Sequence, residues 1–285
     1  MRIDTILHLT DFSDSANQAL SVAVDLASRH GAVLHLFHGL LLHTNRAIDR
    51  ALDACADTAT GRAARLVEQD PTRRLPEVRV SFLHAVSAFD AIMQRINPLQ
   101  PDLIVMGTHG RSGLGRVLMG STAEKVLRHA PGNVVTVKSA VHRVASGDPQ
   151  RVLVPVDFSD GSAQALDVAR WLARATDGRL HLLHVVAEPV PSVSADGQMW
   201  FDLNVAQRIE RRLREWSGDI DGARWSVAEG SVPAQIASAA RNTEADLVVM
   251  GIRGLTGLQN ILIGRVTERV CRSCETPVLV VRDAA

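Results

Sequence analysis

The glycine-rich stretch MGTHGRSGLGRVLMGST, residues 106–122, decides which fold this sequence is expected to adopt. It follows an apolar run that starts at Leu103 and precedes a segment with helical spacing that ends at His129. Glycines at a strand-to-helix turn let the main chain bend sharply, and the amides that open a helix attract anions. A near copy runs from Met250 to Thr267, so one chain contains two candidate phosphate-binding loops.

The similarity between the two halves of the chain extends well beyond this loop. The segment LTDFSD at residues 9–14 returns as PVDFSD at 155–160, an offset of 146 residues. The segment PDLIVMG at 101–107 returns as ADLVVMG at 245–251, an offset of 144 residues. Such a small drift indicates a duplicated fold with minor loop differences. We therefore predict two domains, residues 1–140 and 149–285, within the 285 residues.

The composition excludes several classes of partner and location. Lys and Arg together number 31, as do Asp and Glu, so the charge balance predicts no nucleic-acid partner and no membrane partner. The amino terminus lacks a signal-peptide core, and the apolar stretch from Leu34 to Leu42 is too short to span a bilayer. Three cysteines cannot build a disulfide framework, which agrees with a reducing compartment. We expect a cytoplasmic protein.

Apolar periodicity predicts alternating strands and helices in each half. In the first half we expect strands near residues 6–9, 33–37, 78–83, 103–106 and 134–137, with helices between them. This order predicts an α/β protein made of two tandem, open, parallel five-stranded sheets with helices on both faces. Ligands in such sheets bind beyond the carboxyl ends of the strands, where the strand order reverses. The glycine loops and the acidic ends of the first strands converge there.

Each residue at these positions also has an ordinary structural interpretation. Ser121 fits a capping box with Glu124, which is an alternative to a phosphate contact. Asp11 and Asp157 each precede a helix closely enough to cap it. The strand-end residue His38 returns as His184, and a repeated histidine of this kind is more often structural than a metal ligand.

Other familiar sites do not fit the sequence. The pair Cys271 and Cys274 has no second pair to complete a tetrahedral zinc site, so we expect buried helix cysteines. A dinucleotide fingerprint needs glycines after the first strand, where residues 10–14 have none, and no Walker A lysine is present. These differences argue against dehydrogenases and P-loop motors.

The spacing of the loop resembles the nucleotide-binding signature of the universal stress protein family. Gly107 and Gly110 are followed by nine residues and then by Gly120 and Ser121, and Gly251, Gly254 and Gly264 repeat the spacing. The strand-end Asp-Phe-Ser segments and the closing strands also look like that family. The resemblance covers nearly the whole chain, which is similar to a tandem two-domain member. It implies a Rossmann-like, adenine nucleotide alpha hydrolase-like fold.

The resemblance implies that the cofactor is ATP or another adenine nucleotide, and it leaves open whether magnesium accompanies it. The implied binding residues are Asp11, Gly107, His109, Gly110, Gly120, Ser121 and Thr122, then Asp157, Val185, Gly251, Gly254 and Gly264. The adenine-side position of the first half is Gly39. The family also implies that the last strands, 134–137 and 278–281, pair the two halves within the chain, with a homodimer left open.

The second half departs from this pattern. Arg265 stands where the motif has a hydroxyl residue, so the first half is expected to be the better nucleotide site. No base or metal-binding acidic motif is evident, so we expect a stress-response binding module with slow or no hydrolysis, and no catalytic or metal-ligating residues are assigned. The alternatives are a weak ATP hydrolase or nucleotidyl transferase, or a scaffold that binds an apolar ligand or a partner protein.

Overall fold

A computed structural model of the chain gives the following architecture. It describes residues 2–41, 47–108, 119–138, 151–174, 178–187, 192–193, 199–200, 205–218, 220–254 and 262–282. The first half contains β1 (Thr5–Leu9), α1 (Asp14–His30), β2 (Val33–Leu41), α2 (Ala47–Gln69), β3 (Val78–Ala85), α3 (Ala88–Leu99), β4 (Leu103–Gly107), α4 (Ser121–His129) and β5 (Asn133–Val137).

The second half repeats this order and adds a short hairpin. It contains β6 (Arg151–Pro155), α5 (Asp160–Arg174), β7 (Arg179–Val186), β8 (Ser192–Val193), β9 (Met199–Trp200), α6 (Val205–Ser217), β10 (Arg224–Glu229), α7 (Val232–Asn242), β11 (Leu247–Gly251), α8 (Arg265–Ser273) and β12 (Val278–Val281). The antiparallel pair β8 and β9 forms a separate two-stranded sheet that the sequence pattern did not predict.

The α/β fold and the parallel order within each half are confirmed, but the two sheets are continuous. The strands run β10-β7-β6-β11-β12-β5-β4-β1-β2-β3 in one ten-stranded sheet. All neighbours within a half are parallel, and β12 pairs with β5 in the antiparallel direction, with Leu279 opposite Val135. The order reverses between β1 and β4 and again between β6 and β11, which creates two switch points.

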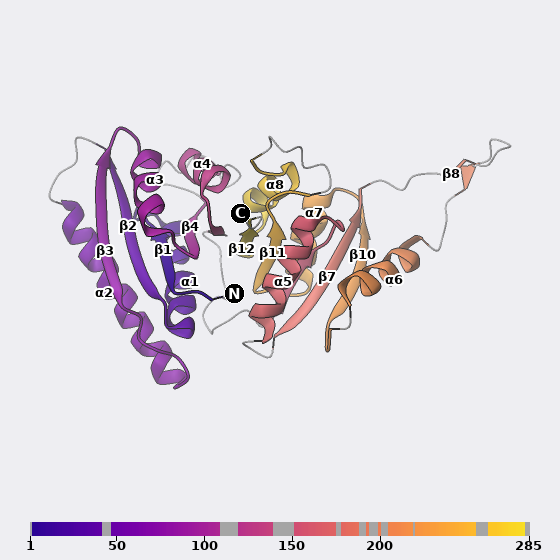
Figure 1. Cartoon of the computed structure of the whole chain (residues 1–285), viewed down its shortest axis with the longest axis horizontal. Coiled ribbons are helices and arrows are strands. Elements are labelled where there is room, and N and C mark those ends of the chain that lie inside the picture. Colours follow the sequence, from indigo (N-terminus) through magenta and orange to yellow (C-terminus); the bar gives the residue numbers. More distant parts are fainter. Residues whose placement is uncertain are drawn as a thin grey trace.

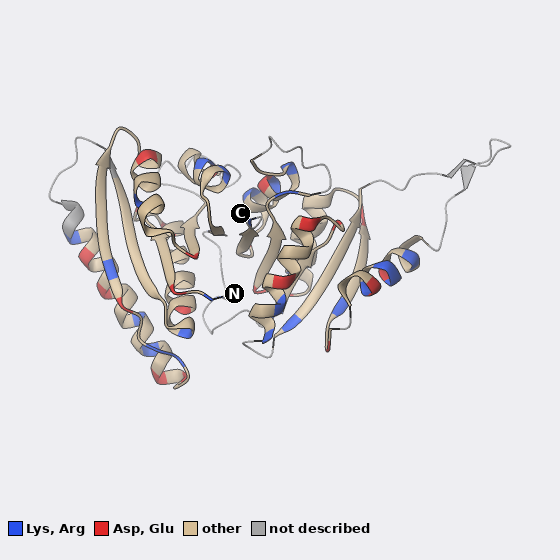
Figure 2. Cartoon of the chain, in the orientation of Figure 1, with Lys and Arg blue, Asp and Glu red and all other residues tan. Residues whose placement is uncertain are grey.

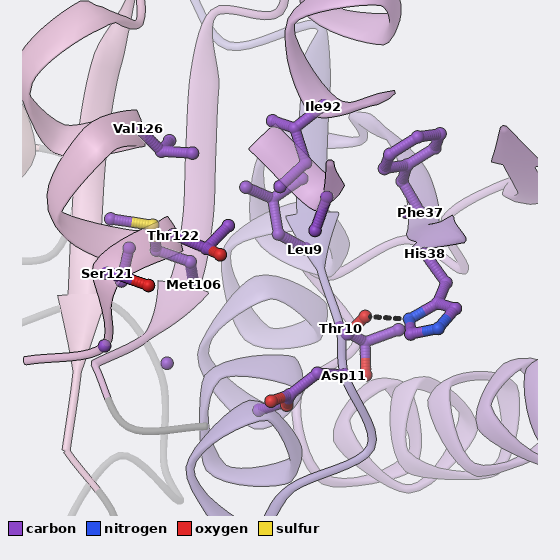
Figure 3. A pocket seen from close by; sticks show the side chains of 16 residues that line it. Leu9, Thr10, Asp11, Phe37, His38, Ile92, Met106, Ser121, Thr122 and Val126 are labelled. Atoms are coloured by element: carbon purple, nitrogen blue, oxygen red, sulfur yellow. Dashed lines mark hydrogen bonds between the residues drawn. The ribbon is translucent and has the colours of Figure 1, made fainter. Parts of the chain in front are cut away.

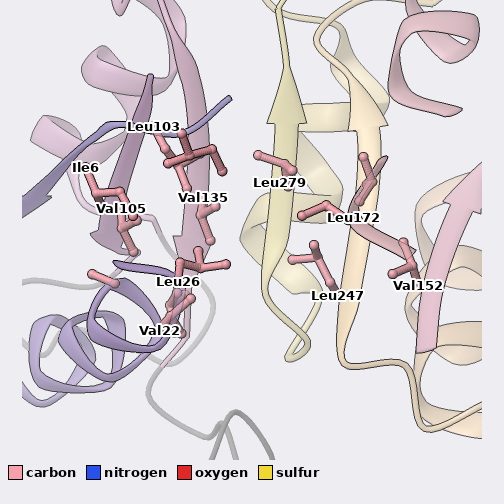
Figure 4. Packing of buried hydrophobic residues seen from close by; sticks show 14 of the residues in the cluster. Ile6, Val22, Leu26, Leu103, Val105, Val135, Val152, Leu172, Leu247 and Leu279 are labelled. Atoms are coloured by element: carbon pink, nitrogen blue, oxygen red, sulfur yellow. The ribbon is translucent and has the colours of Figure 1, made fainter. Parts of the chain in front are cut away.

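The helices cover the two faces of the sheet in matching layers (Figure 1). Residues of α1, α2, α5 and α6 belong to one buried cluster, which includes Leu26, Leu172 and Leu213. Residues of α3, α4, α7 and α8 belong to the other cluster. Figure 4 shows that the first cluster passes from one half to the other, with Val135 and Leu279 at the junction. The halves therefore share a core.

The contacts beside the junction repeat with the same pseudo-symmetry. On α4 and α8, Arg128 lies 3.0 Å from both Glu124 and Glu268, while Arg272 lies 2.9 Å from Glu268. Lys138 donates to the Ser273 carbonyl at the end of α8, and the equivalent Arg282 donates to carbonyls at the end of α4. Cations at helix carboxyl ends are favourable, so each half stabilises a helix of the other.

A close main-chain approach fixes α1 against the end of β4. A Cβ atom added to Gly107 would lie 2.7 Å from the Ser15 carbonyl carbon and 2.8 Å from the Ala16 nitrogen. Gly251 has the same relation to the first turn of α5, where a Cβ atom would lie 2.6 Å from the main chain of Gly161. These two glycines are therefore needed for close packing of the helices against the strand ends.

None of the described helices is both long and apolar enough to cross a membrane. The predicted domain boundary, residues 139–149, lies outside the described residues, between the end of β5 and the start of β6. The boundary therefore stays a prediction.

We expect Gly107→Ala to destabilise the protein by about 1–3 kcal/mol, because the new methyl group meets main-chain atoms that cannot rotate away. Gly61→Ala is the matched control. It lies within α2 with nothing near its added Cβ, and it should stabilise the helix by about 0.5–1 kcal/mol. Urea unfolding of both variants measures the difference, and equal effects would contradict the packing role.

Burial also makes His8 a source of acid sensitivity. Its side chain is 0% exposed within β1, and burial lowers the pKa of His8 from 6.5 to about 4. Because the folded pKa lies below the unfolded value, stability falls as the pH drops from about 6.5 to 4, by roughly 3 kcal/mol in all. His8→Val, which copies Val154 of the second half, should remove this share of the loss. Unfolding free energies at pH 7 and pH 4.5 test it, and an unchanged difference would rule it out.

Candidate functional site

A cavity of about 220 Å³ lies at the switch point of the first half, beyond the carboxyl ends of β1, β2 and β4. We call it the first-half cavity. Figure 3 shows Ser121 and Thr122 on one side and Phe37 and His38 on the other. Its walls include six of the residues expected from sequence, namely Asp11, Gly39, Gly107, Gly120, Ser121 and Thr122. His109 and Gly110 lie outside the described residues.

The loop after β1 is held in a defined shape by Asp11. Its Oδ1 accepts the Ser13 amide at 3.0 Å, and the Ser13 hydroxyl accepts the Ala16 amide at 3.3 Å. The N-cap of α1 is therefore Ser13, so the helix-cap interpretation of Asp11 is wrong. Phe12, between them, has a φ of 63°, a left-handed conformation that is costly for a residue with a Cβ atom.

The repeated histidine supports this loop. His38 Nδ1 lies 2.6 Å from the Thr10 carbonyl, and its ring centroid is 4.8 Å from that of Phe12. A carbonyl only accepts, so Nδ1 carries the proton and donates. His184 makes the same contact with the Val156 carbonyl at 2.7 Å. The structural interpretation of both histidines is confirmed by these contacts.

The amino end of α4 opens onto the cavity. Its N-cap is Gly120, which has no side-chain acceptor, and the Glu124 amide donates to the Gly120 carbonyl at 2.9 Å. The expected capping box is therefore wrong, because Ser121 is already the first helical residue. The first-turn amides and the two hydroxyls of Ser121 and Thr122 thus lie together at one wall of the cavity.

Apolar side chains form the rest of the wall. Sequence reasoning did not assign a site role to Leu9, Phe37, Ile92, Met106 and Val126, all of which line the first-half cavity. These residues look like ordinary core residues in the sequence. Their position at strand ends was the signal for Leu9, Phe37 and Met106, whereas the contribution of α3 through Ile92 needed the tertiary structure.

An equivalent cavity of about 130 Å³, the second-half cavity, lies at the other switch point. All five residues expected there line it, namely Asp157, Val185, Gly251, Gly254 and Gly264. Asp157 Oδ1 accepts the Ser159 amide at 3.1 Å, so Asp157 repeats the turn of Asp11 and is not the cap either. A Cβ atom on Gly254 would lie 2.3 Å from Asp157 Oδ2, so this glycine is required by the carboxylate beside it.

The two cavities differ at the wall formed by the helix. Arg265 and Val266 stand in the positions of Ser121 and Thr122, so the second half lacks both hydroxyls. Thr267 uses its own hydroxyl on the Gly251 carbonyl at 2.9 Å. On the opposite wall, Val185 and Val232 stand where the first half has Gly39 and Ala88. The second-half cavity is smaller and less polar at its helix end.

The cysteines take no part in either cavity. Cys271 and Cys274 are buried as expected, at 1% and 3% exposure, and burial raises the pKa of Cys271 to about 12. Among the described residues there is no group of three His, Cys, Asp or Glu side chains arranged to hold a metal ion.

Comparisons with known proteins agree with this architecture. The family model described as the universal stress protein family matches residues 2–138 and 149–282. A universal stress protein of Methanocaldococcus jannaschii is 31% identical over 143 residues, which are 47% of this chain and 82% of that protein. One from Mycolicibacterium smegmatis is 33% identical over 184 residues, 63% of this chain and 61% of its own length.

Solved structures share the two-domain fold. A crystal structure of a putative universal stress protein from Pseudomonas aeruginosa aligns with a TM-score of 0.67 at 22% identity, covering 98% of this chain and 93% of that one. A universal stress protein from Archaeoglobus fulgidus aligns with a TM-score of 0.66 at 21% identity over the full length of both chains. With two matches that together span nearly its whole length, the chain belongs to the universal stress protein family.

Proposed function

We propose that this protein binds ATP or a related adenine nucleotide in the first-half cavity and acts as a cytoplasmic stress-response binding module. The observation that carries the proposal is that one wall of the cavity is apolar and the opposite wall offers hydrogen-bond donors. Leu9, Phe37 and Ile92 offer an apolar surface, while the opposite wall holds the amino end of α4 with Ser121 and Thr122. A flat heteroaromatic base with a phosphate tail matches both chemistries.

Two further features support binding in the first half. The turn around Asp11 and Phe12 is held by side-chain contacts of the protein itself, so its shape does not depend on a ligand. At Gly39, an added Cβ atom would lie 3.0 Å from the Ala88 carbonyl and 3.2 Å from Ala91, so α3 packs closely at the end where the family resemblance puts adenine. His109 and Gly110 remain proposed members of the loop.

We assign the second half a weaker role in nucleotide binding. Its cavity lacks the two hydroxyls and contains two valines at the adenine side. In this proposal the halves act as one unit through β5 and β12, because separation would expose their shared core. Reduced, buried cysteines are consistent with the cytoplasmic location.

The expected result of transferring the second-half residues to the first half is a loss of nucleotide binding. Ser121→Arg with Thr122→Val removes two hydroxyl donors, and we expect ATP affinity to fall by about tenfold or more. Calorimetry with ATP, with and without magnesium, measures the dissociation constant and the stoichiometry.

The matched control makes the reverse change, Arg265→Ser with Val266→Thr, and should leave the first-half affinity unchanged. A native protein that binds no adenine nucleotide, or a double variant that binds as tightly as the native protein, would overturn the proposal. Steady phosphate release from ATP, lost in the Ser121 double variant, would identify a hydrolase that uses the same cavity.

A further inference from the structure

A second kind of cavity lies at the other end of the second-half strands. It measures about 350 Å³ and is bordered by the first residues of β6, β7 and β10, away from the second-half cavity. Three arginines line it, namely Arg151, Arg179 and Arg224. Figure 2 shows basic residues at the lower ends of β7 and β10. We call it the basic cavity.

The strand register brings these charges together on one face. Arg151 pairs with Arg179, and Arg224 pairs with His181. In-register neighbours of parallel strands point to the same face, as do Arg179 and His181, which are two residues apart. Arg151 and Arg179 are like charges on neighbouring strands and repel each other, and the carboxylates of Glu244 and Asp246 offset the charge of Arg151 alone.

The described residues neutralise only part of this charge. Arg151 lies 2.6 Å from Glu244 and 3.8 Å from Asp246. Across the parts of the chain that the structure describes, neither Arg179 nor Arg224 forms an ion pair. The basic cavity therefore has two guanidinium groups whose donors are available to a ligand.

His181 adds a polar ring to the lining of the basic cavity. Its Nε2 lies 2.7 Å from the Ser226 hydroxyl, while its buried Nδ1 has no hydrogen-bond partner within the described residues. Burial, with Arg224 beside it, lowers the pKa of His181, so the imidazole is neutral at pH 7. When the Ser226 hydroxyl donates to Nε2, the proton of the imidazole is on Nδ1.

The first half has only one arginine at the three equivalent positions, and that arginine is paired with a carboxylate. Thr5 and Val33 occupy the positions of Arg151 and Arg179. Arg79 pairs with His35 as Arg224 pairs with His181, so it occupies the position of Arg224, and it lies 2.7 Å from Glu77. There, Arg95 of α3 reaches His35, with Nη2 2.9 Å from Nδ1, and satisfies the equivalent imidazole. Ala239 replaces Arg95 in the second half, which leaves His181 without that partner.

We propose that the basic cavity binds a phosphate-bearing anion, with the guanidinium groups of Arg179 and Arg224 as the main donors. Guanidinium groups match phosphate oxygens in bidentate geometry. The volume exceeds that of a single small ion and lies within the range of small-ligand sites, so a diphosphate or a small phosphorylated molecule fits better than a lone phosphate. This inference is independent of nucleotide binding in the first half.

The test uses inorganic pyrophosphate as the probe, in calorimetry and thermal unfolding of the full chain at low salt. We expect saturable binding that weakens by about tenfold or more in Arg179→Val with Arg224→Val. Arg179→Val copies Val33 of the first half, and both arginine side chains are exposed, so the fold tolerates the changes. Without pyrophosphate, the double variant should unfold at a higher temperature because the repulsion is removed.

Two controls separate this site from others. Arg211→Ala removes an exposed charge from α6 and should leave binding unchanged. Ser121→Arg with Thr122→Val alters only the first-half cavity and should leave it unchanged too. The proposal is overturned if pyrophosphate does not bind, if Arg211→Ala weakens it as much, if only the Ser121 variant loses it, or if citrate binds as tightly.

Discussion

The main-chain approach between the end of one strand and the start of a helix is the constraint on which both switch points depend. At Gly107 the last residue of β4 lies against the first turn of α1, and at Gly251 the end of β11 lies against α5. Each contact brings the loop after the first strand next to the loop after the fourth. The cavities form because these two loops can then share a wall with the second strand. Glycine is required there by packing, whatever ligand is bound.

The antiparallel pairing of β5 with β12 joins the two halves of the chain. It converts two parallel sheets into one and lets helices of both halves pack on the same faces. Ion pairs then link α4 with α8. Lys138 and Arg282 occupy equivalent positions, and each donates to a carbonyl at the end of a helix in the other half. Surface ion pairs of this kind contribute little alone, and the shared apolar core provides most of the cohesion.

Much of the fold was predictable from the sequence because the information was local or repeated. Strand positions followed from periodicity, and the strand expected at residues 103–106 is observed as β4 at Leu103–Gly107. The six described first-half positions meet in one cavity because they occupy strand ends or the amino end of α4. The capping-box interpretation of Ser121 was wrong because Gly120 is the N-cap of α4. The cap interpretation of Asp11 was wrong because Ser13 is the N-cap of α1.

Other features of the cavities depend on tertiary contacts that the sequence pattern did not indicate. Ile92 of α3 reaches the cavity only because α3 packs over β2, and no spacing in the sequence indicates this. The basic cavity is another example, because only the strand pairing brings Arg151, Arg179 and Arg224 to one end of the second-half strands. The roles of the site residues themselves stay predictions.

Although β5 and β12 run in opposite directions, the carboxyl ends of β2 and β7 both lie at the top of Figure 1. The first-half and second-half cavities, which lie at the carboxyl ends of strands, therefore open on the same side of the molecule, and the basic cavity lies on the other side. The duplicated chain therefore presents two chemically different sides, and a partner that binds one side meets different groups from a partner that binds the other.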